Sequence, residues 1–433
     1  MMEFYIIKRD GIREEFDPQK IKNAVLKAFI SIDGEITPYA EEKAQNIADY
    51  IQGYMEGIPN ELTIDDIQTL VEHGLMSCKR KDVATEYIEY RHDRDTVRKW
   101  NNQMMDVMVE KLKADNIENQ NANVDEHSFG GRKGEAESVI FKQYALDNCV
   151  SKKARERHLN NEIYIHDLDN YAVGMHNCLT VPFDDLLAKG FNTRQTDVRP
   201  ANSINTAFQL VAVLFQLQSL QQFGGVSASH LDWTMVPYVR KSFTKHLKDG
   251  MKYIEKLSDY KIERFDKWVK YEKDGTIHFD DNEFKEKHLA AWDYAMDMTL
   301  KETMQAAEGM YHNLNTLQSR SGNQLPFTSI NYGTCTLPEG RMVIKALLEG
   351  SIKGVGKFHK TSIFPCGIFQ VMKGVNKEPG TLNYDLYRLA LESTARRLYP
   401  NYANVDWSGN AGYDRNDPRT YFSTMGKRKL QLI

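Results

Sequence analysis

From about residue 103 onward, long helical patterns alternate with short apolar runs. NTAFQLVAVLFQLQSLQQF and KEKHLAAWDYAMDMTLKETMQAAEGMYHNL carry apolar residues at helical spacing, whereas EIYIHDLD, FTSINYG and TSIFPCGIFQVM have the composition of strands. This alternation predicts an α/β fold, either a barrel or a layered sheet. Two loops, NANVDEHSFGGRKGEA and FNTRQTDVRPANS, have the composition of ligand-facing loops or of ordinary surface turns.

The first hundred residues predict a separate unit, a β-hairpin followed by a small bundle of four helices. Two strand-like runs flank Asp10-Gly11, a dipeptide that favours a tight hairpin turn. Asp17 is suited to cap the next helix, with Pro18 at its first position. This helix would place its apolar residues on one face, since they recur at helical spacing.

A third helix is expected to begin at Thr63, because Asp66 stands three residues later in a capping-box-like pattern. The charged stretch over residues 92–102 is a natural domain boundary. We therefore expect one domain over residues 1–97 and a second over residues 98–433.

Composition excludes several classes of protein. The 433 residues carry a net charge of −4 that is spread evenly, which argues against a nucleic-acid binder. The opening MMEFYIIKRDGIREEF is charged almost at once, and no later apolar run is long enough to span a bilayer. The five cysteines are far apart and form no C-x-x-C pair, so we expect reduced thiols and no zinc or iron–sulfur site. These features predict a cytoplasmic protein without membrane or nucleic-acid partners.

Three cations near the start of the first predicted helix could bind phosphate. Lys8 and Arg9 precede the hairpin turn, and Lys20 follows it. Amide dipoles at a helix N-terminus and ammonium groups both favour anions. Considered by charge alone, the three residues are better explained as solvated surface charges.

The densest cluster of reactive residue types is IYIHDLDNYAVGMHNCL, residues 163–179. His166, Asp167, Asp169 and His176 suggest a metal site, but their spacing matches no known ligand pattern, and hydrogen bonding alone would explain them. Cys178 could be a buried small hydrophobe. We expect no metal here. The stretch GSIKGVGKFHK is not a phosphate-binding P-loop either, because its spacing and its Phe358 depart from that motif.

The opening YIIKRDGIREEFDPQKIKNAV resembles the ATP-cone, the nucleotide-sensing domain in front of many ribonucleotide reductases. The resemblance rests on KRDG, on F-D-x-x-K-I and on the helices that follow, and it extends to about residue 95. It implies that Lys8, Arg9 and Lys20 bind ATP and dATP as allosteric effectors.

The remainder resembles the anaerobic, class III, ribonucleoside-triphosphate reductases. NQNANVDEHSFGGRKGEA, IYIHDLDNYAVGMHNCL, GFNTRQTDVRPANSI, QSLQQFGG and LALESTARRLYPNY are similar to successive blocks of that family, so the resemblance covers residues 1–426. It implies the first part of a ten-stranded α/β barrel of the glycyl radical enzyme type. It also implies ribonucleoside triphosphate substrates, formate as reductant, a homodimer, and an activase that uses S-adenosylmethionine to generate the glycyl radical.

The resemblance also assigns roles to particular residues. Cys178 matches the cysteine that assists loss of the ribose 2′ hydroxyl, as a hydrogen donor rather than a thiolate nucleophile. Asn177 and His166 would orient substrate or reductant, and Asn202 with Ser203 would contact substrate. Radical chemistry also requires that water be excluded from the site.

The resemblance changes at the last residues, TMGKRKLQLI. In the family the block similar to FSTMG continues with the thiyl cysteine, whereas here Lys427 follows. An amine cannot take part in thiyl exchange, so we expect the chain to be inactive alone, with the glycyl radical region encoded downstream of an interruption. The alternative is a nucleotide-binding regulatory or partner-binding protein derived from the reductase.

Overall fold

The computed structural model describes residues 4–9, 11–58, 61–113, 128–174, 177–222, 224–320, 323–407 and 412–425. The chain divides into two compact units, Met1–Val107 and Met108–Ile433, which we describe separately. Helix α4 (Lys81–Lys113) continues through residues 97 and 98, so the domain boundary placed there stays a prediction.

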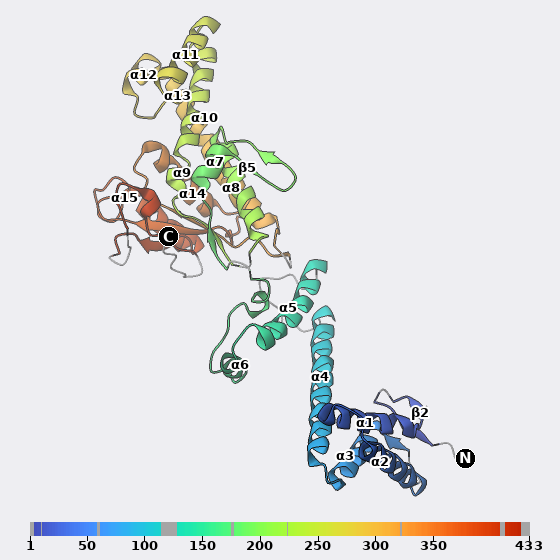
Figure 1. Cartoon of the computed structure of the whole chain (residues 1–433). Helices are drawn as coiled ribbons and strands as arrows, with labels where there is room; N and C mark the ends of the chain where they lie inside the picture. Colours follow the sequence, from blue (N-terminus) through green and yellow to red (C-terminus); the bar gives the residue numbers. More distant parts are fainter. Residues whose placement is uncertain are drawn as a thin grey trace. The chain divides into compact units, whose positions relative to one another are not determined.

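The first unit, hereafter the cone unit, begins with a small sheet and continues as helices (Figure 1). Strand β1 pairs antiparallel with β2 and parallel with β3. Gly11 has φ 79° in the predicted hairpin turn, while Asp10 lies outside the described residues. The elements before α4 are β1 (Tyr5–Ile7), β2 (Arg13–Glu15), α1 (Pro18–Asp33), α2 (Pro38–Glu56), β3 (Leu62–Thr63) and α3 (Ile64–Ser77).

Both predicted helix caps of the cone unit are confirmed. The Asp17 carboxylate accepts a hydrogen bond from Gln19 N at 2.9 Å, with Pro18 at the first helical position of α1. Thr63 and Asp66 form a complete capping box at the start of α3. The apolar faces of α1, α2 and α3 then meet in one core, in which Phe29, Ile51 and Leu75 are fully buried.

The second unit is built on a five-stranded sheet with strand order β10-β9-β8-β7-β4, in which all neighbouring strands are parallel. The α/β class predicted from the sequence is therefore confirmed. The strands of this unit, including a separate antiparallel pair β5–β6, are β4 (Leu179–Thr180), β5 (Phe191–Asn192), β6 (Asp197–Val198), β7 (Val226–Ala228), β8 (Thr328–Tyr332), β9 (Cys366–Val371) and β10 (Asn401–Asn404).

Helices cover one face of the five-stranded sheet, and α10 and α13 run side by side away from it to α11 and α12 (Figure 1). None of the described helices combines the length and the apolar composition that crossing a bilayer requires. The helices are α5 (Phe129–Asn148), α6 (Lys152–Leu159), α7 (Phe183–Lys189), α8 (Ile204–Ser219), α9 (Leu231–Thr234), α10 (Val236–Tyr253), α11 (Asp259–Glu272), α12 (Asn282–Lys287), α13 (Leu289–Thr316), α14 (Pro338–Lys353) and α15 (Tyr384–Arg397).

The two faces of this sheet differ in chemistry. Val226, Ile330 and Phe369 point toward the helices and belong to the main core. The alternating positions point the other way and are mostly polar, apart from Ile368 on β9, so we call them the polar face. The strand register aligns four of them in a row across β4, β7, β8 and β9, and these are Thr180, Ser227, Ser329 and Cys366.

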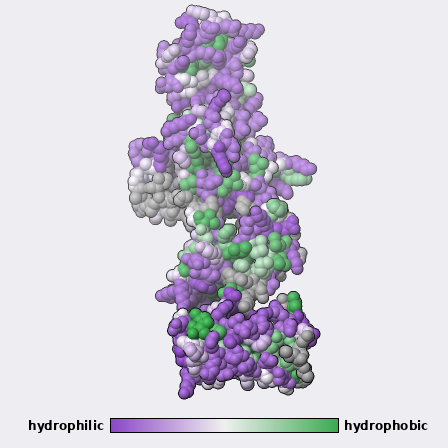
Figure 2. All heavy atoms as spheres, turned by 45° about the vertical axis from the view of Figure 1, so that its right-hand side comes forward, coloured by the Kyte–Doolittle hydropathy of each residue, from purple (hydrophilic) through white to green (hydrophobic). Residues whose placement is uncertain are grey.

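The strand predicted over EIYIHDLD is wrong. Its residues form turns that lead into the short 3-10 helix η2 (Leu168–Asn170). Asp167 has φ 52°, in the left-handed region, which an extended strand cannot include. The apolar run was too short to distinguish a strand from a packed loop. On the surface, exposed hydrophobic residues form small groups in a mainly hydrophilic exterior (Figure 2).

Core packing of the cone unit gives a direct test of the fold. Leu75 is fully buried in α3, whereas its neighbour Met76 is exposed. We expect Leu75→Ala to lower the free energy of unfolding by about 2–5 kcal/mol because it leaves a cavity. Met76→Ala, the matched control, should change it by less than about 0.5 kcal/mol. Chemical unfolding of the two variants measures the difference, and equal losses would contradict the assigned orientation of α3.

Candidate functional site

Two of the predicted phosphate-binding cations converge on one carboxylate of strand β2. The ammonium groups of Lys8 and Lys20 both contact Glu14, the latter at 2.5 Å. Hydrogen bonds from Lys20 and Lys8 lower the pKa of Glu14 from 4.5 to about 2. These contacts are fully present above pH 4.5 and are lost as the pH falls toward about 2. The structure therefore brings Lys8 and Lys20 together, with Glu14 where an anion would bind.

The third predicted cation, Arg9, points elsewhere. Its guanidinium contacts Asp65 at 2.6 Å and Gln68 at 2.7 Å on α3, and Asp95 at 3.3 Å on α4. Gln68 and Asp95 line a cleft of about 580 Å³ between α1 and α4, and Lys20 lines the same cleft. Arg9 therefore helps to position two side chains that line this cleft, Gln68 and Asp95.

The cleft contains more functional side chains than the sequence analysis assigned. Cations can bind phosphate and tyrosine rings can stack on a base. Arg91, Arg94 and Tyr90 were missed, although their spacing in EYIEYRHDRD places them on neighbouring parts of one helical face. The charged and aromatic lining residues are Lys20, Lys27, Glu86, Tyr87, Tyr90, Arg91, Arg94 and Asp95.

In the second unit, Cys178 directly precedes β4 and is half-buried. Its sulfur accepts a hydrogen bond from Gly225 N at 3.4 Å and donates one to Asn177 Oδ1 at 3.4 Å. Gly224 packs so closely on this segment that an added Cβ would lie 1.5 Å from the Asn177 carbonyl oxygen. The glycine pair of QSLQQFGG thus positions Cys178 and Asn177, which the structure brings together.

Arg320 is a further residue of this site that no sequence pattern indicated. Its guanidinium donates to Gly224 O at 2.8 Å and lies 4.1 Å from the centre of the Phe327 ring. Burial lowers the pKa of Arg320 to about 10, although the charges of Asp167 and Cys178 act in the opposite direction. A largely desolvated cation therefore lies within electrostatic reach of Cys178.

His166 lies at the edge of this region. Its ring is exposed, contacts Asp167 Oδ2 at 2.5 Å and meets the edge of the Tyr164 ring. Because the charge of Asp167 acts on Arg320, His166 can influence the cysteine through these two residues. No three potential metal-ligand side chains gather among the described residues, and His176 lies outside them.

The structure does not bring Asn202 and Ser203 to Cys178. The Ser203 hydroxyl caps α8 by accepting from Thr206 N at 3.2 Å, and Asn202 is exposed beside it. Gly225, the partner of Cys178, follows the opposite end of α8. Sixteen helical residues separate these ends by about 24 Å. Their role in substrate binding stays a prediction.

The polar face of the sheet holds a segment from much later in the chain. The side chain of Asn331 on β8 donates to Thr424 O at 3.0 Å and accepts from Thr424 N at 3.1 Å. Gln370 on β9 donates to Phe422 O at 3.0 Å. Both amides are fully buried. These amides hydrogen-bond the main chain of the late segment, and Lys427, just beyond it, lies outside the described residues.

Both units match known families. Residues 4–96 match the ATP cone domain, and residues 120–430 match the anaerobic ribonucleoside-triphosphate reductases. The chain therefore belongs to the anaerobic ribonucleoside-triphosphate reductase family.

The chain is also similar to individual proteins. The chain is 32% identical over 410 residues to the anaerobic ribonucleoside-triphosphate reductase of Haemophilus influenzae, covering 94% of this chain and 53% of that protein. It is 30% identical over 406 residues to the Escherichia coli protein of that name, covering 93% and 51%. A crystal structure of the Thermotoga maritima anaerobic ribonucleotide reductase with citrate in the active site has a TM-score of 0.46 at 16% identity, covering 74% of this chain and 55% of that chain. The chain spans about half the length of these curated relatives.

Replacing the Asn331 amide tests whether it holds the late segment. We expect Asn331→Leu to speed hydrogen exchange of the Thr424 amide roughly fivefold or more, since a lost hydrogen bond typically costs about 1 kcal/mol. Thr328→Val on the same strand is the control, because the Thr328 hydroxyl has no partner among the described residues. Hydrogen exchange is measured by NMR or mass spectrometry. Unchanged exchange of the Thr424 amide in Asn331→Leu would show that the Asn331 side chain does not hold the late segment.

Proposed function

We propose that this chain supplies the nucleotide-sensing cone and the Cys178 side of the active site of an anaerobic ribonucleoside-triphosphate reductase. The observation that carries the proposal is the setting of Cys178. Its thiol accepts a backbone hydrogen bond just before β4, and the half-buried guanidinium of Arg320 lies within electrostatic reach. A thiol that is held in place and partly shielded from water suits hydrogen donation. Family membership supplies the reaction class.

In this reaction Cys178 donates hydrogen while the 2′ hydroxyl of the ribose leaves as water. A glycyl radical and formate would supply the radical and the reducing electrons to the complete protein. Asn177 would orient the reacting groups next to the thiol, and Arg320 would attract an anionic reductant such as formate, because opposite charges interact strongly where water is excluded. His166 would contribute only through Asp167.

The partners follow from the same proposal. Substrates are ribonucleoside triphosphates, and the radical is generated by an S-adenosylmethionine-dependent activase. The complete protein would act as a homodimer in the cytoplasm, in keeping with the free cysteines of the described chain. ATP and dATP would bind as effectors in the cleft between α1 and α4, where Lys20 and the arginines of α4 provide positive charge.

The effector site is testable by calorimetry on the full chain. We expect Lys8→Ala combined with Lys20→Ala to weaken ATP binding at least roughly tenfold, because two charge-assisted contacts are lost and Glu14 is left to repel phosphate. Lys22→Ala is the control. Lys22 lies two residues after Lys20 in α1, so its side chain faces another direction. Equal affinity in the double variant and the control would place the effector elsewhere.

The reductase proposal is tested by complementation. The chain would be incubated anaerobically with ATP, CTP, formate, S-adenosylmethionine and activase, alone and with the separately expressed C-terminal half of the Haemophilus influenzae relative. We expect deoxycytidine triphosphate only in the complemented reaction, and none with Cys178→Ala. If the two halves bind each other but the complemented reaction gives no product, the result would instead favour a regulatory protein. Product with Cys178→Ala would refute the role of this thiol.

A further inference from the structure

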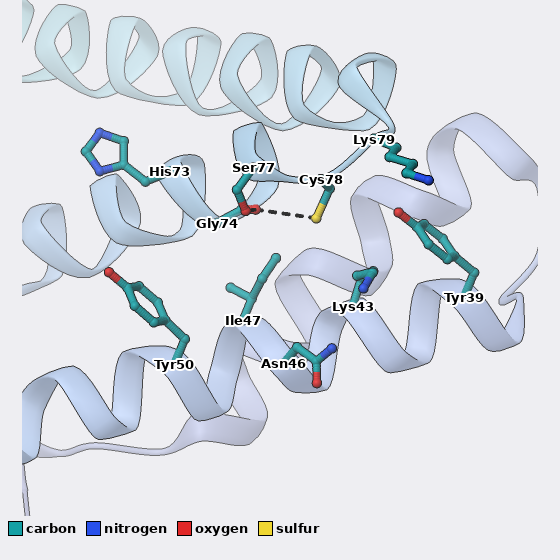
Figure 3. A pocket seen from close by; sticks show the side chains of 10 residues that line it. All are labelled: Tyr39, Lys43, Asn46, Ile47, Tyr50, His73, Gly74, Ser77, Cys78 and Lys79. Carbon is teal, nitrogen blue, oxygen red and sulfur yellow. Dashed lines mark hydrogen bonds between the residues drawn. The ribbon is translucent and has the colours of Figure 1, made fainter.

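The cone unit contains a second pocket, which is separate from the proposed effector cleft. It has a volume of about 780 Å³ and lies between α2 and the end of α3 (Figure 3). The effector cleft is lined by α1, α4 and Gln68, and the two pockets share no lining residue. A ligand could therefore occupy one without displacing a ligand from the other.

The lining of this pocket is positively charged. Lys43 and Lys79 line it, and none of the described residues that line it is Asp or Glu. Lys43 does contact Glu42 at 3.2 Å, but this carboxylate is 63% exposed and does not line the pocket. Exposed ion pairs of this kind contribute little, so Lys43 can turn to a bound anion. The effector cleft, by contrast, includes Glu86 and Asp95 in its lining.

The end of α3 does not cancel this charge. The carbonyl groups at a helix C-terminus normally repel anions. Here Gly74 O accepts from Ser77 Oγ at 2.6 Å and from Cys78 Sγ at 3.4 Å, and Met76 O accepts from Lys81 Nζ. Because these carbonyl groups already have donors, the lysines dominate the nearby field.

Aromatic side chains occupy both ends of the pocket. Figure 3 shows Tyr50 and His73 toward one end, and Tyr39 with Lys43 and Lys79 toward the other. Lys43 and Tyr50 are separated by about two turns of α2, roughly 10 Å along its axis. Tyrosine and histidine rings can stack on a base, while lysine binds phosphate as a point charge.

We propose that this pocket is a second nucleotide site of the cone unit, with phosphate at Lys43 and Lys79 and the base between Tyr50 and His73. The occupant is a nucleoside phosphate rather than free phosphate, because the cations occupy only one end of the pocket. Two nucleotides would then bind per cone unit, one in the effector cleft and one between α2 and α3.

Cys78 gives a specific readout of occupancy. It is half-buried, lines the pocket and is the only cysteine before Cys149 in the sequence. In the full chain we expect ATP to slow alkylation of the Cys78 thiol at least roughly fivefold. Mass spectrometry measures the extent of alkylation over time. Alkylation of the exposed Cys149, in the other unit, should be unchanged and serves as an internal control.

Two double variants separate this site from the effector cleft. Lys43→Ala with Lys79→Ala should abolish the protection of Cys78 while ATP still binds the effector cleft by calorimetry. Lys8→Ala with Lys20→Ala should leave the protection unchanged, even where it weakens binding in the cleft. Because these lysines are solvent-accessible, circular dichroism is expected to show native folding for both double variants.

Three results would overturn the proposal. The first is unprotected Cys78 at ATP concentrations that saturate the effector cleft. The second is loss of protection in the Lys8 and Lys20 variant, which would show that Cys78 responds to the cleft instead. The third is equal protection by inorganic tripolyphosphate and by ATP, which would indicate an anion site that does not recognise the base.

Discussion

The parallel register of β4, β7, β8 and β9 determines which side chains of the second unit meet. Because side chains alternate along a strand, this register sends Val226, Ile330 and Phe369 into the core beneath the helices. The same register aligns hydroxyl and thiol groups on the opposite face. A shift of one residue would exchange the two sets and leave apolar side chains where the chain now places Asn331 and Gln370.

Charge arranges the cone unit in a comparable way. Glu14 gathers Lys8 and Lys20, while the carboxylates of α3 and α4 hold Arg9. A phosphate that binds near these three cations must therefore compete with the acids that hold them. The pocket between α2 and α3 has no such acids among its described lining residues, so the two sites would respond differently to anion charge and to salt.

Local chemistry made much of this fold predictable. The caps at Asp17 and Thr63 depend on neighbouring residues, and the segments around Ile330 and Phe369 have the composition of strands, so sequence alone located them. The site around Cys178 was harder, since Arg320 reaches it from a loop far along the chain and no periodicity marks that residue. Asn331 left a weaker signal because other polar residues share its strand, and Gln370 is a single polar residue within an apolar strand. The strand expected around His166 failed because Asp167 adopts a left-handed conformation.

The close approach of Gly224 to Asn177 also has a consequence for how this site tolerates sequence change. The thiol is located by two stretches of main chain in direct contact and by the polar side chains of Asn177 and Arg320, so its position does not depend on how apolar side chains fill the core. Residues of the surrounding core can therefore be replaced by larger or smaller apolar residues without moving the sulfur. Gly224 itself cannot be replaced, because even one methyl group would separate its main chain from that of Asn177.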